Sequence, residues 1–145
     1  GKFLFLEDVQ DPGNVGTIIR TADAAGFTGV IVSDKSADTY SLKTLRSMQG
    51  SHFHLPIYRM SNQVLLEKVK KAGIHVLATT LSKDSVDYRE LPPIENFVLV
   101  MGNEGQGISS VMAESADQLV HIGMKGRAES LNVAVAAGIL MFYFS

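Results

Sequence analysis

Residues 101–110 (MGNEGQGISS) form the first segment whose side chains could carry chemistry. They follow the apolar run 97–100 and resemble a phosphate-binding loop in glycine content. A P-loop needs a lysine after the second glycine of G-x-x-x-x-G-K-[ST], and Ile108 stands there instead. The order G-x-x-G-x-G also differs from the G-x-G-x-x-G of dinucleotide-binding folds. A strand-to-helix turn that needs glycine is an alternative, but the carboxylate of Glu104 favours a cationic or hydroxyl-bearing ligand over a phosphate.

A second candidate is residues 11–27 (DPGNVGTIIRTADAAGF), where a turn leads into a predicted helix. Asn14 is predicted to cap this helix. Gly16 indicates close approach of another backbone, because glycine inside a helix costs about 1 kcal/mol relative to alanine. An arginine solvated on the helix surface is the usual case. Arg20, however, follows an apolar pair and lies on a helix that leaves a sheet edge.

The third candidate is residues 121–140 (HIGMKGRAESLNVAVAAGIL). A glycine-containing loop, 123–128, precedes a helix predicted from about Ser130. Glu129 and Ser130 suit the positive end of that helix. Asn132 is an unusual choice for a first turn unless its amide is used, whereas the small residues that follow it indicate tight packing.

Apolar runs alternate with helical patterns along the chain, and these elements must position the three segments. The pattern predicts strands at 3–6, 29–32, 55–60, 74–80, 96–102 and 118–124, and helices at 14–25, 41–48, 62–72, 109–114 and 130–144. Gly73 is predicted to end the third helix. The last helix carries Leu131, Val135, Ile139 and Phe142 along one stripe. The alternation predicts one α/β domain with a parallel sheet covered on both faces.

Composition excludes several classes of protein. The 145 residues suit one domain, and 46% hydrophobic with 19% charged residues indicates a packed core. The chain has no cysteine, which excludes disulfides and thiolate metal sites and is compatible with the cytoplasm, where we expect the protein.

His52 and His54 are spaced like metal ligands, but they read as strand positions, so no metal is expected. No apolar run reaches the ~18 residues of a membrane helix. The net charge of −2 leaves any nucleic-acid contact to local patches.

Together the three segments resemble the SpoU-type RNA methyltransferases, the TrmH-like branch of the SPOUT superfamily. The matches are N-x-G-x-I-x-R-x-A at Asn14, Gly16, Ile18, Arg20 and Ala22; G-x-E-G at Gly102, Glu104 and Gly105; and I-P-M-x-G-x-x-x-S-L-N-V-S-V-A at Ile122, Met124, Gly126, Ser130, Leu131, Asn132, Val133, Val135 and Ala136. Gly123 stands in place of the family's proline, and Ala134 in place of a common serine. Neither departure removes a residue that the resemblance makes catalytic.

The resemblance implies a mostly parallel sheet flanked by helices, whose C-terminal segment forms a deep trefoil knot, a very rare topology. It also implies a homodimer packed through the knot region, with S-adenosylmethionine bound in the knot and S-adenosylhomocysteine as product. The residues implied to line the cofactor cleft are Thr79, Thr80, Leu81, Gly102, Asn103, Glu104, Gly105, Ile122, Met124, Ser130, Leu131 and Asn132. The glycines of 102–105 are expected to let the backbone approach the cofactor.

The implied reaction is methyl transfer to a ribose 2′-hydroxyl of ribosomal or transfer RNA. The implied catalytic residues are Arg20, Asn14, Glu104, Ser130 and Asn132. Because arginine is not deprotonated in proteins, Arg20 is expected to hold the RNA phosphate and to stabilise charge on the 2′-oxygen. The proton is expected to leave through the phosphate, water, Glu104 or Ser130. RNA contacts are expected at Arg20, Arg46, Lys125 and Arg127.

Two alternatives stay open. The first is a base methyltransferase of the same superfamily, against which the S-L-N signature and Arg20 argue. The second is a non-catalytic RNA-binding or assembly module that keeps the fold, against which the intact set of polar motif residues argues. Relatives commonly carry an N-terminal RNA-binding domain. Residues 1–145 are expected to be the methyltransferase domain alone, with that extension absent or removed.

Overall fold

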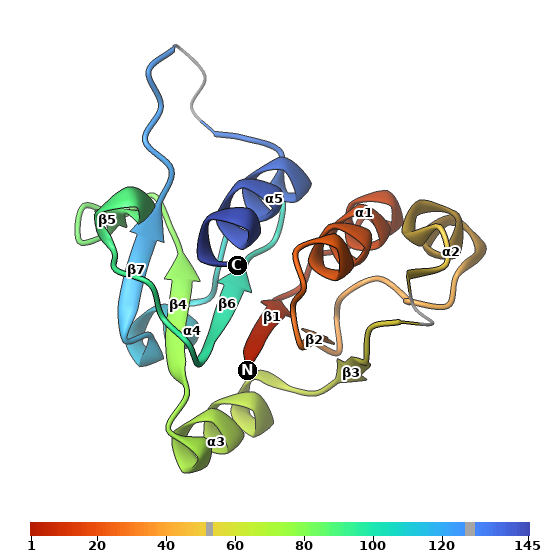
Figure 1. The fold of residues 1–145 in the computed structure, drawn as a ribbon, viewed down its shortest axis with the longest axis horizontal. Coiled ribbons are helices and arrows are strands. Elements are labelled where there is room, and N and C mark those ends of the chain that lie inside the picture. The colour runs from red at the N-terminus through yellow and green to blue at the C-terminus, as the bar shows by residue number, and fades with distance from the viewer. Residues whose placement is uncertain (52–53, 127–129) are drawn as a thin grey trace.

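A seven-stranded parallel sheet forms the centre of the structure, a computed structural model that describes residues 1–51, 54–126 and 130–145 (Figure 1). The spatial order of the strands is β3-β2-β1-β6-β4-β7-β5, and every pairing between them is parallel. The strands are β1 (Lys2–Leu6), β2 (Gly29–Val32), β3 (Ile57–Arg59), β4 (His75–Thr79), β5 (Val86–Asp87), β6 (Phe97–Met101) and β7 (Gln118–His121). The central position of β1 and β6 places the ends of two of the candidate segments side by side.

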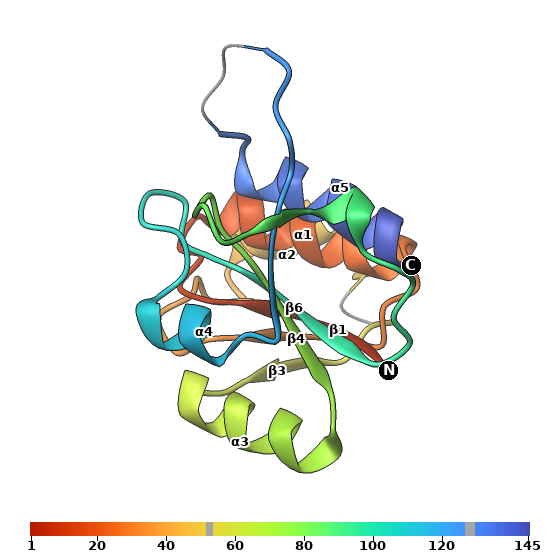
Figure 2. The ribbon, with the colours of Figure 1, turned by 90° about the vertical axis from the view of Figure 1, so that its left-hand side faces the viewer.

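Helices cover both faces of the sheet, as the sequence predicts. They are α1 (Pro12–Ala24), α2 (Leu42–Met48), α3 (Asn62–Ala72), α4 (Ser110–Ser115) and α5 (Val133–Phe144), and a 3-10 turn lies at Tyr88–Glu90. Figure 2 shows α1, α2 and α5 on one face and α3 and α4 on the other. Among the described residues, no helix is long and apolar enough to span a bilayer.

The core consists of two apolar layers, one on each face of the sheet. Leu4 and Leu6 of β1 pack toward α1 and α5, whereas Phe5 between them packs toward α3 and α4. This alternation follows from the two-residue period of a strand. All of β6 is buried, because both of its faces are covered and it has a neighbour on each side.

The predicted elements are confirmed in type, but the cap predicted for α1 is wrong. The N-cap is Asp11, whose Oδ2 accepts the Asn14 backbone N–H at 2.8 Å, and Pro12 occupies the first helical position. Aspartate at the N-cap followed by proline is a favourable start for a helix. Asn14 therefore lies inside the first turn, and its side chain is free for other contacts.

The start of α5 also differs from the prediction. Asn132 is the N-cap, and its Oδ1 accepts the N–H groups of Ala134 at 2.8 Å and Val135 at 3.2 Å. The helix therefore begins at Val133 rather than near Ser130. Glu129, predicted to favour the helix start, lies outside the described residues.

The apolar stripe predicted on α5 faces outward. Val135, Ile139 and Phe142 are exposed, whereas the side of the helix that meets the sheet carries Ala137, Leu140, Met141 and Phe144. A helix that is apolar all round gives no pattern from which to choose the buried face. The stripe is thus an apolar surface on the outside of the domain.

Two edge features escaped the sequence pattern. The short strand β5 pairs with β7 at the sheet edge, and the 3-10 turn follows it directly. Two residues are too few to produce a detectable period. The strand predicted at 118–124 ends at His121, so its last part belongs to the loop that leads toward α5. The trefoil knot stays a prediction.

Close approach of α1 to α2 at Gly16 is confirmed. A Cβ atom at this position would lie 2.3 Å from the Cβ of Ser47 and 2.6 Å from the carbonyl oxygen of Thr44, both on α2. No side chain fits there without moving backbone, so the glycine is required by helix packing.

Candidate active site

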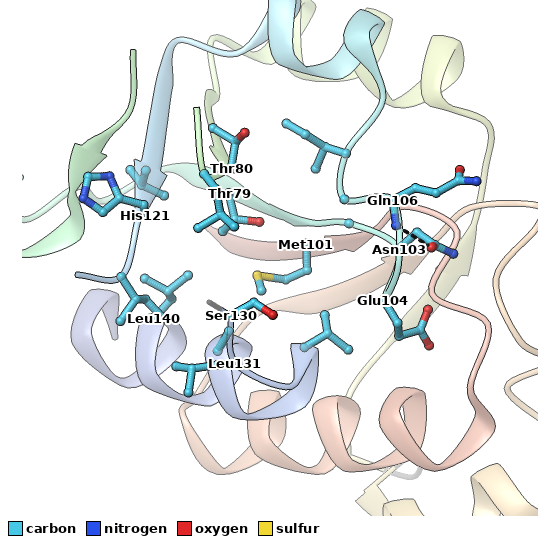
Figure 3. A pocket seen from close by; sticks show the side chains of 18 of the residues that line it. Thr79, Thr80, Met101, Asn103, Glu104, Gln106, His121, Ser130, Leu131 and Leu140 are labelled. Carbon is cyan, nitrogen blue, oxygen red and sulfur yellow. Dashed lines mark hydrogen bonds between the residues drawn. The ribbon is translucent and has the colours of Figure 1, made fainter. Parts of the chain in front are cut away.

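A cleft of about 430 Å³ lies at the carboxyl end of the sheet, where β4, β6 and β7 end. Its volume is within the range of small-molecule sites, and this edge is where open parallel α/β sheets bind ligands. Figure 3 shows Thr79 and Thr80 on one side of the hollow, Leu131 and Leu140 on the side of α5, and Met101 between them. The walls are thus partly hydroxyl-bearing and partly apolar.

All of the residues predicted to contact a cofactor line this cleft except Asn132. Ten further residues line the cleft without having been predicted as cofactor contacts, namely Ser82, Met101, Gln106, Gly107, Ile108, Val120, His121, Val133, Ala136 and Leu140. Most of them lie at or just after the ends of the same strands, or on the inner side of α5. The strand ends were therefore the signal that could have found them.

The glycine loop after β6 is closed by its own hydrogen bonds. Asn103 and Gly107 exchange two backbone bonds of 3.1 and 2.9 Å, and the Asn103 Oδ1 accepts the N–H groups of Gly105 and Gln106. A Cβ atom on Gly102 would lie 2.3 Å from the carbonyl carbon of Gly107. Gly102 therefore meets a steric need within the loop itself, and the approach of a cofactor to this backbone stays a prediction.

Glu104 reaches back to the segment that precedes α1. Its Oε2 accepts the Asp11 N–H at 2.8 Å and its Oε1 accepts the Gln10 N–H at 3.2 Å. Partial burial raises the pKa of Glu104, but the backbone N–H groups of Asp11, Glu104 and Gln10 and the Asn14 side chain outweigh it and lower this pKa below its usual value. The carboxylate is therefore ionised and anchored, and it is a weaker base than an ordinary glutamate.

Asn103 and Asn132 complete the connection between the three segments. The Asn103 Nδ2 donates to the Asp8 carbonyl oxygen at 2.8 Å, and the Asn132 Nδ2 donates to the Asn14 Oδ1 at 3.2 Å. Asn132 thus meets the first turn of α1 while it caps α5. The amide that seemed misplaced in the sequence is used twice.

Glu7 holds the end of the glycine loop in place, and the sequence analysis did not single out this residue. This side chain is 2% exposed. Its oxygens accept the N–H and the hydroxyl of Ser109, each at 2.6 Å, and the side-chain amide of Asn62. A carboxylate directly after a buried strand was the available signal. Glu7 fixes the point where the loop enters α4.

Gly123, which replaces the family's proline, lies against an ion pair. Arg89 binds Asp87 through Nε and Nη2, each at 2.9 Å. This side-chain bond is the main reason that the pKa of Asp87 falls well below its usual range, and the Gly123 backbone also contributes. A Cβ atom at position 123 would lie 2.6 Å from the Asp87 Oδ2. The glycine therefore leaves room for this carboxylate beside the cleft loop.

The remaining predicted residues divide between the cleft and the surface. Ser130 lines the cleft. Arg20 on α1 and Arg46 on α2 are exposed, as is Lys125 in the loop after β7, and none of the three lines the cleft. Arg127 lies outside the described residues.

The residues that the structure describes contain no group of three or more histidine or acidic side chains that could hold a metal ion. His54 is exposed, and His52 lies outside the described residues. His121 lines the cleft, and its Nδ1 hydrogen-bonds the Ser85 hydroxyl at 2.9 Å.

The fold and the site define a parallel α/β domain with a small-molecule cleft built from strand ends and the start of α5. Residues 1–142 match the SpoU rRNA Methylase family, and the chain belongs to this family. It is 46% identical over 142 residues to the 23S rRNA (guanosine(2553)-2'-O)-methyltransferase RlmP of Bacillus subtilis, a match that covers 98% of this chain and 57% of that protein.

Two solved structures extend the comparison. An AdoMet-bound rRNA methyltransferase from Sinorhizobium meliloti superimposes with a TM-score of 0.93 at 44% identity, over 97% of this chain and 54% of that one. The TrmH/SpoU tRNA modifying enzyme of A. aeolicus gives a TM-score of 0.84 at 36% identity, over 97% of this chain and 72% of that one. The chain thus spans little more than half the length of the B. subtilis and S. meliloti proteins.

Proposed function

We propose that this domain transfers a methyl group from S-adenosylmethionine to a ribose 2′-hydroxyl of ribosomal or transfer RNA. The observation that carries the proposal is the meeting of Asn14, Glu104 and Asn132 at the rim of a cleft of suitable size. These residues come from three distant segments. A merely structural module would not need such a convergence of polar side chains at the ligand edge of the sheet.

The cleft suits this cofactor chemically. Ile122, Leu131 and Leu140 offer apolar walls for an adenine ring, and the backbone groups after β4, β6 and β7 offer donors and acceptors. The ionised Glu104 at the rim favours a positively charged sulfonium. When bound, S-adenosylmethionine supplies the activated methyl group.

The role of the protein is then to place the ribose hydroxyl in line with the methyl group and to stabilise the charge that develops. Glu104 is held by two backbone N–H groups, and its lowered pKa makes it a poor proton acceptor. We assign it a positioning role for the segment before α1. The proton then leaves through the RNA phosphate, water or Ser130, which lines the cleft.

We further propose that two copies pair through α5. The exposed stripe Val135, Ile139 and Phe142 supplies an apolar surface for pairing. The same helix carries cleft-lining residues on its other side, so a copy packed on the stripe lies beside the cleft.

Pairing also accounts for Arg20. This side chain does not line the cleft of its own chain. Arg20 directly precedes Thr21 on α1. Thr21 lies against α5, because a Cβ atom on Gly138 would lie 3.6 Å from the Thr21 Cγ2. Arg20 is therefore beside the surface on which the second copy would pack, and it would complete the site of that copy by binding the RNA phosphate.

The names of the relatives favour RNA as substrate, and both rRNA and tRNA enzymes are among them. We expect the protein to act on such RNA in the cytoplasm. A base methyltransferase and a non-catalytic assembly module are the competing functions. Neither accounts better for the polar residues at the cleft.

The test is methylation, by the full-length protein, of protein-free rRNA and bulk tRNA from a strain that lacks the gene. We expect label from S-adenosylmethionine to appear on a single ribose, mapped by nuclease digestion and mass spectrometry. A methyl group on a base would establish the first competitor. Calorimetry without any heat of cofactor binding would establish the second.

A further inference from the structure

An exposed aromatic side chain stands next to the site and has no part in the function described so far. Tyr40, between β2 and α2, is 68% exposed, more than any other aromatic side chain in the described part of the chain. Lys35, Lys43 and Arg46 flank it in the sequence and are also exposed. We call these four residues the Tyr40 edge.

The turn that carries Tyr40 is well defined. Its backbone N–H donates to the Asp38 Oδ1 at 2.9 Å, in the manner of an Asx turn. The preceding residue, Thr39, is buried. The following residue, Ser41, caps α2 through a bond from the Thr44 N–H. Anchors on both sides therefore hold the ring outward, so its exposure is not that of a loose loop tip.

The Tyr40 edge is continuous with the active-site rim. The Ala37 N–H donates to the Val9 carbonyl at 2.9 Å, which ties this stretch to the segment held by Glu104. A Cβ atom on Gly13 would lie 4.0 Å from the Lys43 Cε. Lys43 thus extends over the first turn of α1, where Asn14 meets Asn132.

The cations of the Tyr40 edge are available for a ligand. Within residues 1–51, 54–126 and 130–145, the ion pair formed is that of Arg89 with Asp87, and it lies elsewhere. Three of the acids nearby accept hydrogen bonds inside the protein: Asp8 from Ser33, Asp11 from the Asn14 N–H, and Asp38 from the Tyr40 N–H. The fourth, Asp34, is exposed beside Lys35. Lys43 and Arg46 are exposed and form no ion pair within the described residues, so each can bind a phosphate.

We propose that Tyr40 stacks on an unpaired base of the RNA next to the methylated nucleotide, while Lys43 and Arg46 bind the adjoining phosphates. The inference rests on the proposed function, because it names the form in which that substrate is recognised. An aromatic face with flanking cations matches single-stranded nucleic acid, whose bases expose their faces. The bases of a duplex are already stacked on one another, so this edge selects a loop, bulge or strand end.

Binding of an unstructured RNA of about 12 nucleotides, a length that such surfaces cover, tests the proposal directly. The full-length protein is titrated with this RNA and with its duplex, followed by fluorescence anisotropy. We expect Tyr40→Ala to weaken single-strand binding about 5- to 150-fold, the range for loss of one stacked base. Tyr40→Phe keeps the ring and should bind like the wild type. The matched control is Tyr58→Ala, since Tyr58 is 48% exposed on β3, at the sheet edge opposite to the cleft strands β4 and β7.

The result that overturns the inference is equal single-strand affinity of Tyr40→Ala and the wild type, or binding of neither RNA by the wild-type protein. A loss that is equal for single strand and duplex would also contradict it, because it would indicate a general electrostatic effect or a protein-binding surface.

Methyl transfer and cofactor affinity separate this inference from the function on which it rests. If the wild type methylates RNA and Tyr40→Ala does so with unchanged KM, the stacking role fails and the proposed function stands. If single-strand binding depends on Tyr40 but no S-adenosylmethionine binds, the surface stands and the methyltransferase function fails. Tyr40→Ala should raise KM for RNA and leave cofactor affinity unchanged.

Discussion

The Asn132 side chain donates from Nδ2 to the Oδ1 of Asn14 at 3.2 Å, across 118 residues of sequence. Asn132 caps α5 with its other side-chain atom, and the Asn14 side chain is one of the groups that stabilise the Glu104 carboxylate. A single contact between two amides therefore connects the loop after β6, the start of α1 and the start of α5. Each motif depends on the position of the other two.

The substitution Asn132→Asp distinguishes the two roles of this side chain, which are capping α5 and donating to Asn14. Aspartate keeps the oxygen that accepts the helix N–H groups, so we expect the free energy of unfolding to change by less than about 0.5 kcal/mol, whereas Asn132→Ala should lose about 1 kcal/mol. Both lack the amide donor, and methyl transfer should fall about 10- to 100-fold through misplacement of the rim. Urea unfolding and turnover on RNA are the measurements. Full activity in Asn132→Asp would show that the amide contact has no role.

Glu104→Gln should loosen the segment that leads into α1. The variant keeps one carbonyl acceptor but loses the charge that strengthens the bonds from Gln10 and Asp11. We expect the amides of these two residues to exchange about tenfold faster, which corresponds to about 1.4 kcal/mol, and methyl transfer to fall with them. Hydrogen exchange by NMR measures the first effect. Glu114→Gln, at an exposed position on α4, is the control and should leave both amides unchanged.

The Glu104 carboxylate also predicts a pH dependence. Its pKa is lowered in the folded protein, so its contribution to the free energy of unfolding is fully present above the ordinary glutamate pKa of about 4.3 and is lost as the pH falls through the folded-state value. The difference in stability between the wild type and Glu104→Gln should stay constant from about pH 7 to 5 and shrink below about pH 4. A difference that grows in acid would contradict the assigned direction of the shift.

Gly16→Ala and Gly138→Ala form a matched pair of substitutions inside helices. The new Cβ atom of the first would lie 2.3 Å from the Ser47 Cβ, whereas the nearest atom to that of the second is 3.6 Å away. We expect Gly16→Ala to lose about 1–3 kcal/mol of stability through overpacking. Gly138→Ala should be neutral or gain up to about 1 kcal/mol from helix propensity. Thermal unfolding measures the stability of both variants relative to the wild type. Equal stabilities of the two variants would refute the close contact between α1 and α2.

Gly102→Ala and Gly105→Ala distinguish a steric need within the loop from a need for backbone freedom near a ligand. A Cβ atom on Gly102 would collide with the backbone of Gly107 and Ile108, but one on Gly105 meets only the Asn103 Oδ1 at 3.6 Å. We expect Gly102→Ala to abolish S-adenosylmethionine binding in calorimetry, because the loop cannot close. Gly105→Ala should keep the affinity within about fivefold, a change of about 1 kcal/mol. Loss of binding in Gly105→Ala alone would instead favour direct contact with the cofactor.

Phe142→Glu tests the proposed pairing through α5. A charge in the centre of an apolar interface is costly, so we expect the dimer to dissociate in light scattering. Methyl transfer should fall if Arg20 completes the site of the second copy, while cofactor affinity changes little. Val64→Glu, on the exposed side of α3 across the sheet, serves as control and should leave the mass unchanged. A monomeric wild-type protein with full activity would refute the pairing.

Local patterns predicted the elements well where these were long, whereas the residues of the cofactor cleft were implied by the resemblance to the family. The strands with continuous apolar runs and the amphipathic helix α3 were correctly placed, and the strand ends after β4, β6 and β7 do converge on one cleft. The outward face of α5 and the short β5 could not be predicted, since the first has no polar side and the second has no measurable period.

The types of residue at Asn14, Glu104 and Asn132, the need for glycine at positions 16 and 102, and the alternation of strands and helices were determined by the sequence alone. What each of these groups touches was decided only by the tertiary structure. Because β1 lies between β2 and β6 in the sheet, the loop after β6 faces the segment after β1, and Glu104 meets Gln10 and Asp11 rather than its own neighbours. Strand order depends on contacts between distant parts of the chain, and no local period encodes such contacts.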